Sequence, residues 1–120
     1  MENISLGEKG MIFAEIIWEN EPLSSRRLTE LCEEKLNWKR TTTYTMLKNL
    51  CDKGIIKNDG GTVTSLMSRE EIGALKGEEV VNENFGGSLP KFIAAFTRKN
   101  KLNQREIEEL QSLIDNFKEE

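Results

Sequence analysis

Residues 37–57 of the chain read NWKRTTTYTMLKNLCDKGIIK, and this stretch decides the fold. Its apolar residues recur at helical spacing, which predicts a helix over about 40–53 with one narrow apolar stripe: Met46, Leu47, Leu50 and Cys51. Gly54 follows at the position where glycine often caps a helix C-terminus. The three threonines that open this helix are poor helix formers, so helix propensity does not explain their presence.

The same region concentrates positive charge in an acidic chain. The protein has 120 residues and a formal net charge of −4, but residues 35–57 hold six basic side chains and one acidic side chain. The local potential at a groove matters more to DNA than the total charge does. Hydroxyl and methyl groups of threonine suit phosphates and base edges. We therefore predict that this helix reads DNA, using the threonines at 41, 42 and 45 together with Arg40 and Lys48.

Helical patterns precede this stretch and a hairpin pattern follows it. A first helix is expected over 8–20, and Pro22 lies just beyond its end because proline cannot continue the hydrogen-bond ladder. Ser24 or Ser25 is a suitable N-cap for a second helix. The Asn-Asp-Gly-Gly sequence at 58–61 is a strong turn signal between two short strands. This order of elements is that of a winged helix-turn-helix.

Three further helices are expected after the hairpin. Ser68 with Glu71, and Asn103 with Glu106, fit the capping box, and Ser88 is a candidate cap for a helix between them. The apolar faces of these helices are too large to be covered within about 50 residues, so a two-fold partner is the economical solution. Folding back onto the first domain is the alternative. We predict dimerisation through Leu89, Phe92, Ile93, Phe96, Ile107, Leu110, Leu113, Ile114 and Phe117.

The sequence thus predicts a mainly α-helical protein with two domains. Residues 1–67 are expected to form an N-terminal winged helix-turn-helix DNA-binding domain with a two-stranded wing. Residues 68–120 are expected to form a C-terminal helical dimerisation domain. No stretch approaches the roughly 20 apolar residues that cross a bilayer, and the N-terminus does not resemble a signal peptide. We expect a cytoplasmic protein that does not contact membranes.

The residue types do not favour enzymatic or metal chemistry. The chain has no histidine, the commonest general base, and its carboxylates fall in runs typical of solvated surfaces. We therefore expect no catalytic residues, no metal and no cofactor. Cys32 and Cys51 are interpreted as small apolar residues, with a redox pair as an unsupported alternative. Trp18 and Trp38 are interpreted as packing residues rather than base-stacking platforms.

A set of residues spread over nearly the whole chain matches the pattern of a known family: Ile16-Ile17-Trp18, Trp38, Thr42, Thr45-Met46-Leu47, Leu50, Lys53-Gly54, Phe85, Gly87, Leu89 and Glu106-Ile107-Glu108-Glu109-Leu110. On these residues the chain resembles the penicillinase-repressor family, the winged-helix repressors of β-lactamase and methicillin-resistance genes with their copper-responsive relatives. The resemblance implies a homodimer that places each third helix in a major groove of a pseudo-palindromic operator. It also implies that Thr42 and Thr45 contact bases or phosphates. The full set of expected DNA-binding residues is Lys39, Arg40, Thr41, Thr42, Tyr44, Thr45 and Lys48.

Three departures from the family pattern bear on DNA contact and regulation. The wing tip carries Asp59 where the family often has a basic residue near its glycine, so we expect a weak wing contact with phosphates. The copper branch has a C-terminal cysteine motif that this sequence lacks, so we expect no copper control. The β-lactam branch is cut between asparagine and phenylalanine after a membrane sensor's signal, and this chain has Ala95-Phe96 there. A sensor-linked protease is therefore a candidate partner, and the inducing signal stays open.

Two basic groups outside the third helix have open interpretations. Arg26 and Arg27 are equally suited to clamping a phosphate or to an ordinary solvated face. We interpret Arg98, Lys99 and Lys101 as a charged helix end and loop, because cations suit helix C-termini.

The function also has an alternative from another class. A winged-helix protein-interaction module without DNA affinity would fit the acidic total charge. The two hypotheses differ at the third helix, since a module without DNA affinity has no reason to keep Arg40, Thr42, Thr45 and Lys48 exposed together.

Overall fold

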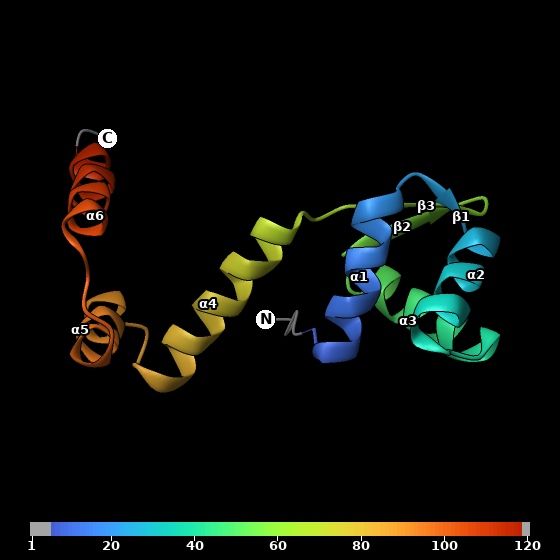
Figure 1. Ribbon diagram of the computed structural model, residues 1–120, viewed down its shortest axis with the longest axis horizontal. Helices are drawn as coiled ribbons and strands as arrows, with labels where there is room; N and C mark the ends of the chain where they lie inside the picture. Colours follow the sequence, from blue (N-terminus) through green and yellow to red (C-terminus); the bar gives the residue numbers. More distant parts are fainter. Residues whose placement is uncertain (1–5, 119–120) are drawn as a thin grey trace. The chain divides into compact units, whose positions relative to one another are not determined.

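The computed structural model describes residues 6–118 of the chain, which form helices and one small sheet (Figure 1). The elements are α1 (Glu8–Asn20), β1 (Leu23–Ser24), α2 (Ser25–Leu36), α3 (Arg40–Asp52), β2 (Ile56–Asp59), β3 (Thr62–Ser65), α4 (Arg69–Asn84), α5 (Leu89–Lys99) and α6 (Gln104–Lys118). A winged helix followed by three helices was predicted from the sequence, and this mainly helical fold class is confirmed. The chain forms two compact units, Met1–Gly77 and Glu78–Glu120.

Helix α2 is capped at both ends, and its C-terminal cap leads into the turn before α3. Ser24 is the N-cap, and its Oγ accepts a hydrogen bond from the backbone N–H of Arg27 at 2.9 Å. Asn37 closes the helix in the left-handed region with φ 56°, a conformation that asparagine tolerates better than most residues. Only residues 37–39 then separate α2 from α3, which produces the short connection of a helix-turn-helix.

The predicted hairpin is present, and a third strand extends it. Strands β2 and β3 pair antiparallel, and Gly60 and Gly61 join them with φ values of 58° and 95°. Two residues with positive φ are what a type I′ hairpin turn requires. Asn58 Oδ1 accepts from the Gly61 N–H at 3.1 Å and supports the turn. Strand β1 was not predicted. It pairs antiparallel with β3 through Leu23 opposite Val63, so the sheet order is β1-β3-β2.

One hydrophobic core holds α1, α2, α3 and the sheet together. Its members are Leu6, Phe13, Ala14, Ile16, Ile17, Leu23, Leu28, Leu31, Cys32, Leu47, Leu50, Ile55, Ile56, Val63 and Ile72. Both tryptophans pack at its edge. Trp38 stacks on Phe13 with ring centroids 5.8 Å apart, and Trp18 Nε1 donates to the Met67 carbonyl at 2.9 Å. The core therefore fixes the orientation of α3, the helix that the sequence predicts to read DNA.

The start of α4 belongs to the same compact unit. Glu71 N–H donates to Ser68 Oγ at 3.1 Å and Ser68 N–H donates to Glu71 Oε1 at 3.2 Å, which is the predicted capping box. One turn later, Ile72 is fully buried in the core. The guanidinium of Arg69 lies 5.5 Å from the ring centroid of Trp18. This packing is part of the first compact unit, which extends to Gly77.

Local caps also start the two helices that follow α4. Ser88 Oγ accepts from the Lys91 N–H at 3.2 Å and caps α5. Asn103 Oδ1 accepts from the Glu106 N–H at 2.8 Å, and Glu106 Oε1 accepts from the Asn103 N–H at 3.1 Å, so α6 opens with the predicted capping box. These bonds define the helices individually, since each connects residues three positions apart.

Candidate nucleic-acid interface

Helix α3 has one face in the core and the other in solvent. Thr43, Leu47 and Leu50 are its buried residues. The seven expected DNA-binding residues are all exposed: Lys39, Arg40, Thr41, Thr42, Tyr44, Thr45 and Lys48. At 100° per residue, Thr45 lies opposite the buried stripe, and residues three or four positions away flank it. The structure therefore brings the expected residues together on the outer face and at the start of one helix.

Asn49 lies on the same outer face and was not among the expected DNA-binding residues. It is exposed and follows Thr45 by four positions, so the two side chains are neighbours on the helix surface. An amide side chain can make a bidentate contact with adenine, which makes Asn49 chemically suited to base recognition. The helical spacing of the sequence already contained this signal.

The N-terminal end of α3 suits a phosphate group. No side chain caps this end, and no acidic residue occupies the first turn. The first backbone N–H groups of a helix lack intrahelical acceptors and carry partial positive charge, which favours anions. Lys39 and Arg40 add two full charges at the same end. Within residues 6–118, neither of them nor Lys48 forms an ion pair with a carboxylate, so their charges are not neutralised locally.

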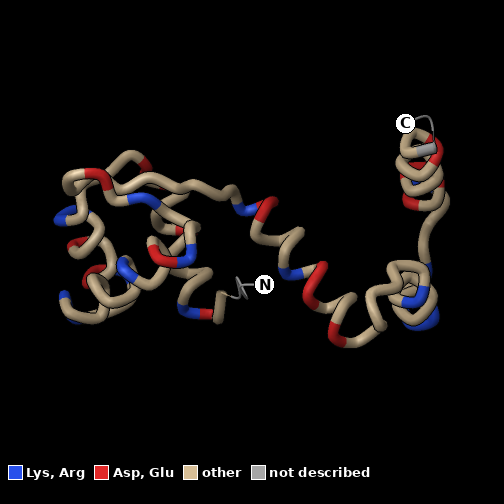
Figure 2. Tube along the Cα trace, turned by 180° about the vertical axis from the view of Figure 1, so that it is seen from behind, with Lys and Arg blue, Asp and Glu red and all other residues tan. Residues whose placement is uncertain are grey.

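Charge at the wing tip is balanced. Figure 2 shows basic and acidic residues interspersed along the first unit. At the hairpin, Lys57 Nζ lies 3.9 Å from Asp59 Oδ2, and both side chains are exposed. An exposed pair of this kind stabilises the fold by about 0–1 kcal/mol. It leaves little net charge for phosphates, as expected from the aspartate at this position.

The two arginines at the start of α2 differ in their surroundings. Arg27 Nη1 lies 3.4 Å from Glu30 Oε1 on the same helix surface, which fits an ordinary solvated face. Arg26 is exposed and forms no ion pair within the described part of the chain. Arg26 is therefore the better suited of the two to a phosphate contact.

The expected dimerisation residues lie on α5 and α6, and none of them is buried within the chain. Leu89, Phe96, Ile107, Leu113, Ile114 and Phe117 are exposed, and Phe92, Ile93 and Leu110 are half-buried. The exposed fraction of Phe117 reaches 74%. Phe92 makes aromatic contacts with Phe85 and Phe96, at centroid distances of 5.5 and 5.9 Å. Apolar surface gathered in this way is typical of an interaction site.

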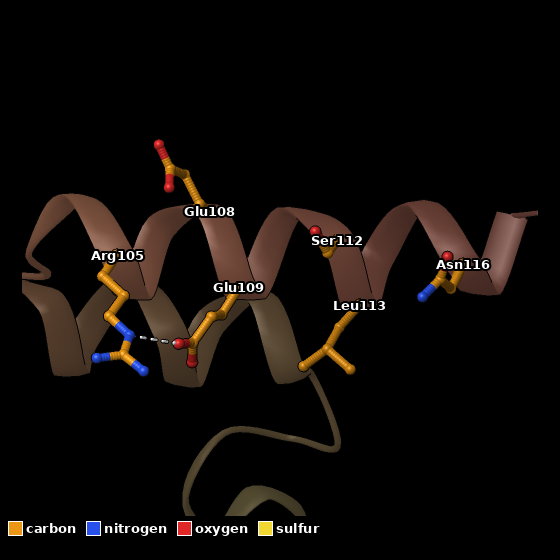
Figure 3. A pocket seen from close by; sticks show the side chains of 6 residues that line it. All are labelled: Arg105, Glu108, Glu109, Ser112, Leu113 and Asn116. Carbon is orange, nitrogen blue, oxygen red and sulfur yellow. Dashed lines mark hydrogen bonds and ion pairs between the residues drawn. The ribbon is translucent and has the colours of Figure 1, made fainter.

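An open depression on α6 is lined by polar residues and by Leu113, one of the expected dimerisation residues. Figure 3 shows a surface depression lined by Arg105, Glu108, Glu109, Ser112, Leu113 and Asn116. Arg105 Nε donates to Glu109 Oε1 at 3.0 Å across it. All of its lining residues come from one exposed helix, so the depression does not enclose a small molecule as a ligand pocket does.

The described residues show little metal or thiol chemistry. Within residues 6–118, no three side chains of His, Cys, Asp or Glu are grouped so that they could hold a metal ion. Both cysteines are free, and burial raises the pKa of the Cys32 and Cys51 thiols. A raised pKa lowers the thiolate fraction, and the thiolate is the reactive form. No helix among these residues is long and apolar enough to cross a membrane.

The fold and the outer face of α3 define a winged-helix protein of the DNA-binding class. A family comparison identifies it further: the model of the penicillinase repressor family matches residues 6–116, nearly the whole chain, and the chain belongs to this family. The family resemblance seen in the sequence is thereby confirmed. Family membership supports a DNA-binding transcriptional repressor, a class of regulators rather than enzymes. No curated protein matches the chain in sequence.

Proposed function

We propose that the chain represses transcription in the cytoplasm as a homodimer on a pseudo-palindromic operator, with α3 as the recognition helix. The observation that carries this proposal is that the seven expected residues are exposed on α3 or, for Lys39, at its N-cap, while the inner face of this helix is fixed in the core. The major groove, about 12 Å wide, admits an α-helix. Thr42 and Thr45 would then reach base edges, while Lys39, Arg40 and Lys48 would contact phosphates.

Dimerisation is proposed because the second compact unit has apolar faces without a core. No residue from 78 to 117 is buried in the isolated chain. Burying a large apolar side chain is worth about 1.5–3 kcal/mol relative to leaving it exposed, so the apolar stripes of α5 and α6 favour association. A two-fold dimer would present two copies of α3 about one turn of DNA apart, roughly 34 Å. We propose that DNA binding lies within residues 1–67 and dimerisation within residues 68–120, where α5 and α6 carry the exposed apolar faces.

A sensor-linked protease is proposed as a regulatory partner. The Ala95–Phe96 bond lies inside α5, with Ala95 half-buried and Phe96 exposed. A protease that cuts an extended chain must first open this helix. Helix α5 has no buried residue in the isolated chain, and segments with few buried contacts open locally at low cost. Cleavage there would separate α6 and its apolar stripe from the DNA-binding unit.

Fluorescence anisotropy with DNA from upstream of the protein's own gene tests the proposed function. The expected result is tight, salt-sensitive binding with two chains per site, and much weaker binding to scrambled DNA of the same length. Lys9→Ala, an exposed charge removal on α1, is the control variant and should bind like the unmodified protein. Equal and weak binding to both DNAs, unchanged by Lys48→Ala, would instead support the protein-interaction module.

A further inference from the structure

The C-terminal unit contains a second basic segment. Residues 84–105 hold five basic and no acidic side chains, whereas acidic residues dominate on both sides of this segment. Lys91, Arg98, Lys99 and Lys101 are all exposed. None of these four forms an ion pair with a carboxylate of the described chain. An acidic protein thus carries two basic regions, and only one of them is the predicted recognition helix.

Lys91 and Arg98 share the side of α5 that faces away from its apolar stripe. They are seven positions apart, which is two helical turns, so they lie on one face. At 100° per residue, this face is rotated by roughly 150–170° from the centre of the apolar stripe, which consists of Leu89, Phe92, Ile93 and Phe96. A partner that buries the stripe would leave the basic face in solvent.

The local structure of α5 does not account for Lys91. Arg98 and Lys99 are in the last turn, where the negative end of the helix dipole favours cations. Lys91 is in the first turn, where the positive end disfavours them, and its backbone N–H is already bonded to Ser88. The charge of Lys91 therefore opposes the dipole of its own helix and points to an anion outside the chain.

We propose that Lys91 and Arg98, with Lys99 and Lys101 beside them, form a second DNA-contact face that binds phosphates of the duplex flanking the operator. This proposal rests on the proposed function, because it requires a dimer held on DNA by α3. The outer face of α5 would act without base recognition, since the ammonium and guanidinium groups of these residues pair with phosphate oxygens irrespective of sequence.

DNA is the favoured anion because α3 already brings it to the same chain. The intervening α4 has 16 residues and is therefore roughly 24 Å long, which limits how far α5 can be from bound DNA. Tethering at this range gives a second contact a high effective concentration even when its intrinsic affinity is low. Each phosphate neutralised by a cation releases counterions and steepens the salt dependence of binding.

The experiment compares two duplexes and two double variants. One duplex contains only the two operator half-sites, and the other extends it by about two helical turns on each side. Lys91→Ala/Arg98→Ala removes four cations per dimer. On the long duplex it should lower the slope of log K against log salt by up to about 3.6, at 0.9 for each contact, with no change on the short duplex. Lys91→Arg/Arg98→Lys keeps the charges and should restore the slope.

Two controls separate this inference from the proposed function. Lys9→Ala/Arg105→Ala removes the same number of charges outside the proposed contact face and should leave both slopes unchanged, because Arg105, the fifth basic residue of the segment, is already paired with Glu109. Sedimentation should show that every variant keeps the mass of the unmodified protein. If the unmodified protein does not select the operator, the proposed function fails. If it does, but Lys91→Ala/Arg98→Ala binds the long duplex like the unmodified protein, the second face fails and an acidic protein partner becomes its better explanation. An equal decrease of the salt slope on both duplexes would also refute the second DNA-contact face.

Discussion

Replacing Ile72 with alanine tests whether the start of α4 is part of the DNA-binding unit's core. Ile72 is 0% exposed and lies in the cluster formed by the helices and sheet of that unit. The change removes three carbon atoms, worth about 2.4 kcal/mol at 0.8 kcal/mol for each buried methylene. The cavity that remains adds to this, so the expected loss of unfolding free energy is about 2–5 kcal/mol.

Thermal and urea unfolding followed by tryptophan fluorescence measures this loss directly. Both tryptophans of the chain, Trp18 and Trp38, pack at the edge of the same core and report on this unit. In a unit of this size each kcal/mol lowers the melting temperature by about 4–8 °C, so a decrease of at least about 8 °C is expected. Ile72→Val should lose only about 0.5–1.5 kcal/mol.

Leu66→Ala is the matched control for Ile72→Ala. Leu66 lies three residues before the start of α4, but its side chain is 56% exposed. The loss of unfolding free energy for Leu66→Ala should therefore stay within about 0.5 kcal/mol. If Ile72→Ala unfolds at the same midpoint as Leu66→Ala, the first turns of α4 do not contribute to this core. The explanation for the compact unit that extends to Gly77 would then be wrong.

Three more changes test the interface, the dimer and the sheet. Thr45→Ala should alter sequence preference, whereas Lys48→Ala should weaken binding to all sequences and lower the salt slope by about one. Fluorescence anisotropy on an operator and its variants measures both effects. If neither substitution changes DNA binding, α3 is not the helix that reads DNA. Leu113→Asp should give monomers on sedimentation, because it places a charge in the proposed apolar interface; a surviving dimer contradicts that interface. Glu21 accepts from Ser65 N–H at 2.8 Å and from its Oγ at 2.9 Å, so Glu21→Ala should lower the unfolding free energy by about 1–3 kcal/mol in urea.

Much of the candidate site followed from helical periodicity alone. Because Leu47 and Leu50 point into the core, the residues on the opposite side of the same helix must be exposed, and Thr45 lies there. The paired role of α5 and α6 in dimerisation was also inferred from their apolar spacing. It stays a prediction, because the structure contains one chain. The missed base-recognition candidate is Asn49, whose position on the outer face was readable from the same periodicity.

The sequence by itself determined the local features of this protein. Ser24, Ser68 and Asn103 each bond a backbone N–H three residues later, and Gly60 and Gly61 permit the positive φ values of the hairpin turn. The physical signals for these features lie within a few neighbouring residues. Helix starts, the hairpin and the exposed face of α3 were therefore predictable before any packing was known.

Only the tertiary structure decided which distant segments meet. Strand β1 is two residues long and carries no strand pattern of its own. It forms because it pairs with the neighbouring strand β3, where Leu23 lies opposite Val63. In the same way, Ile72 is buried because the first turn of α4 packs against a core whose other members lie mainly on α1, α2, α3 and the sheet. Long-range pairing depends on the combined shape of several elements, and periodicity within one element does not specify it.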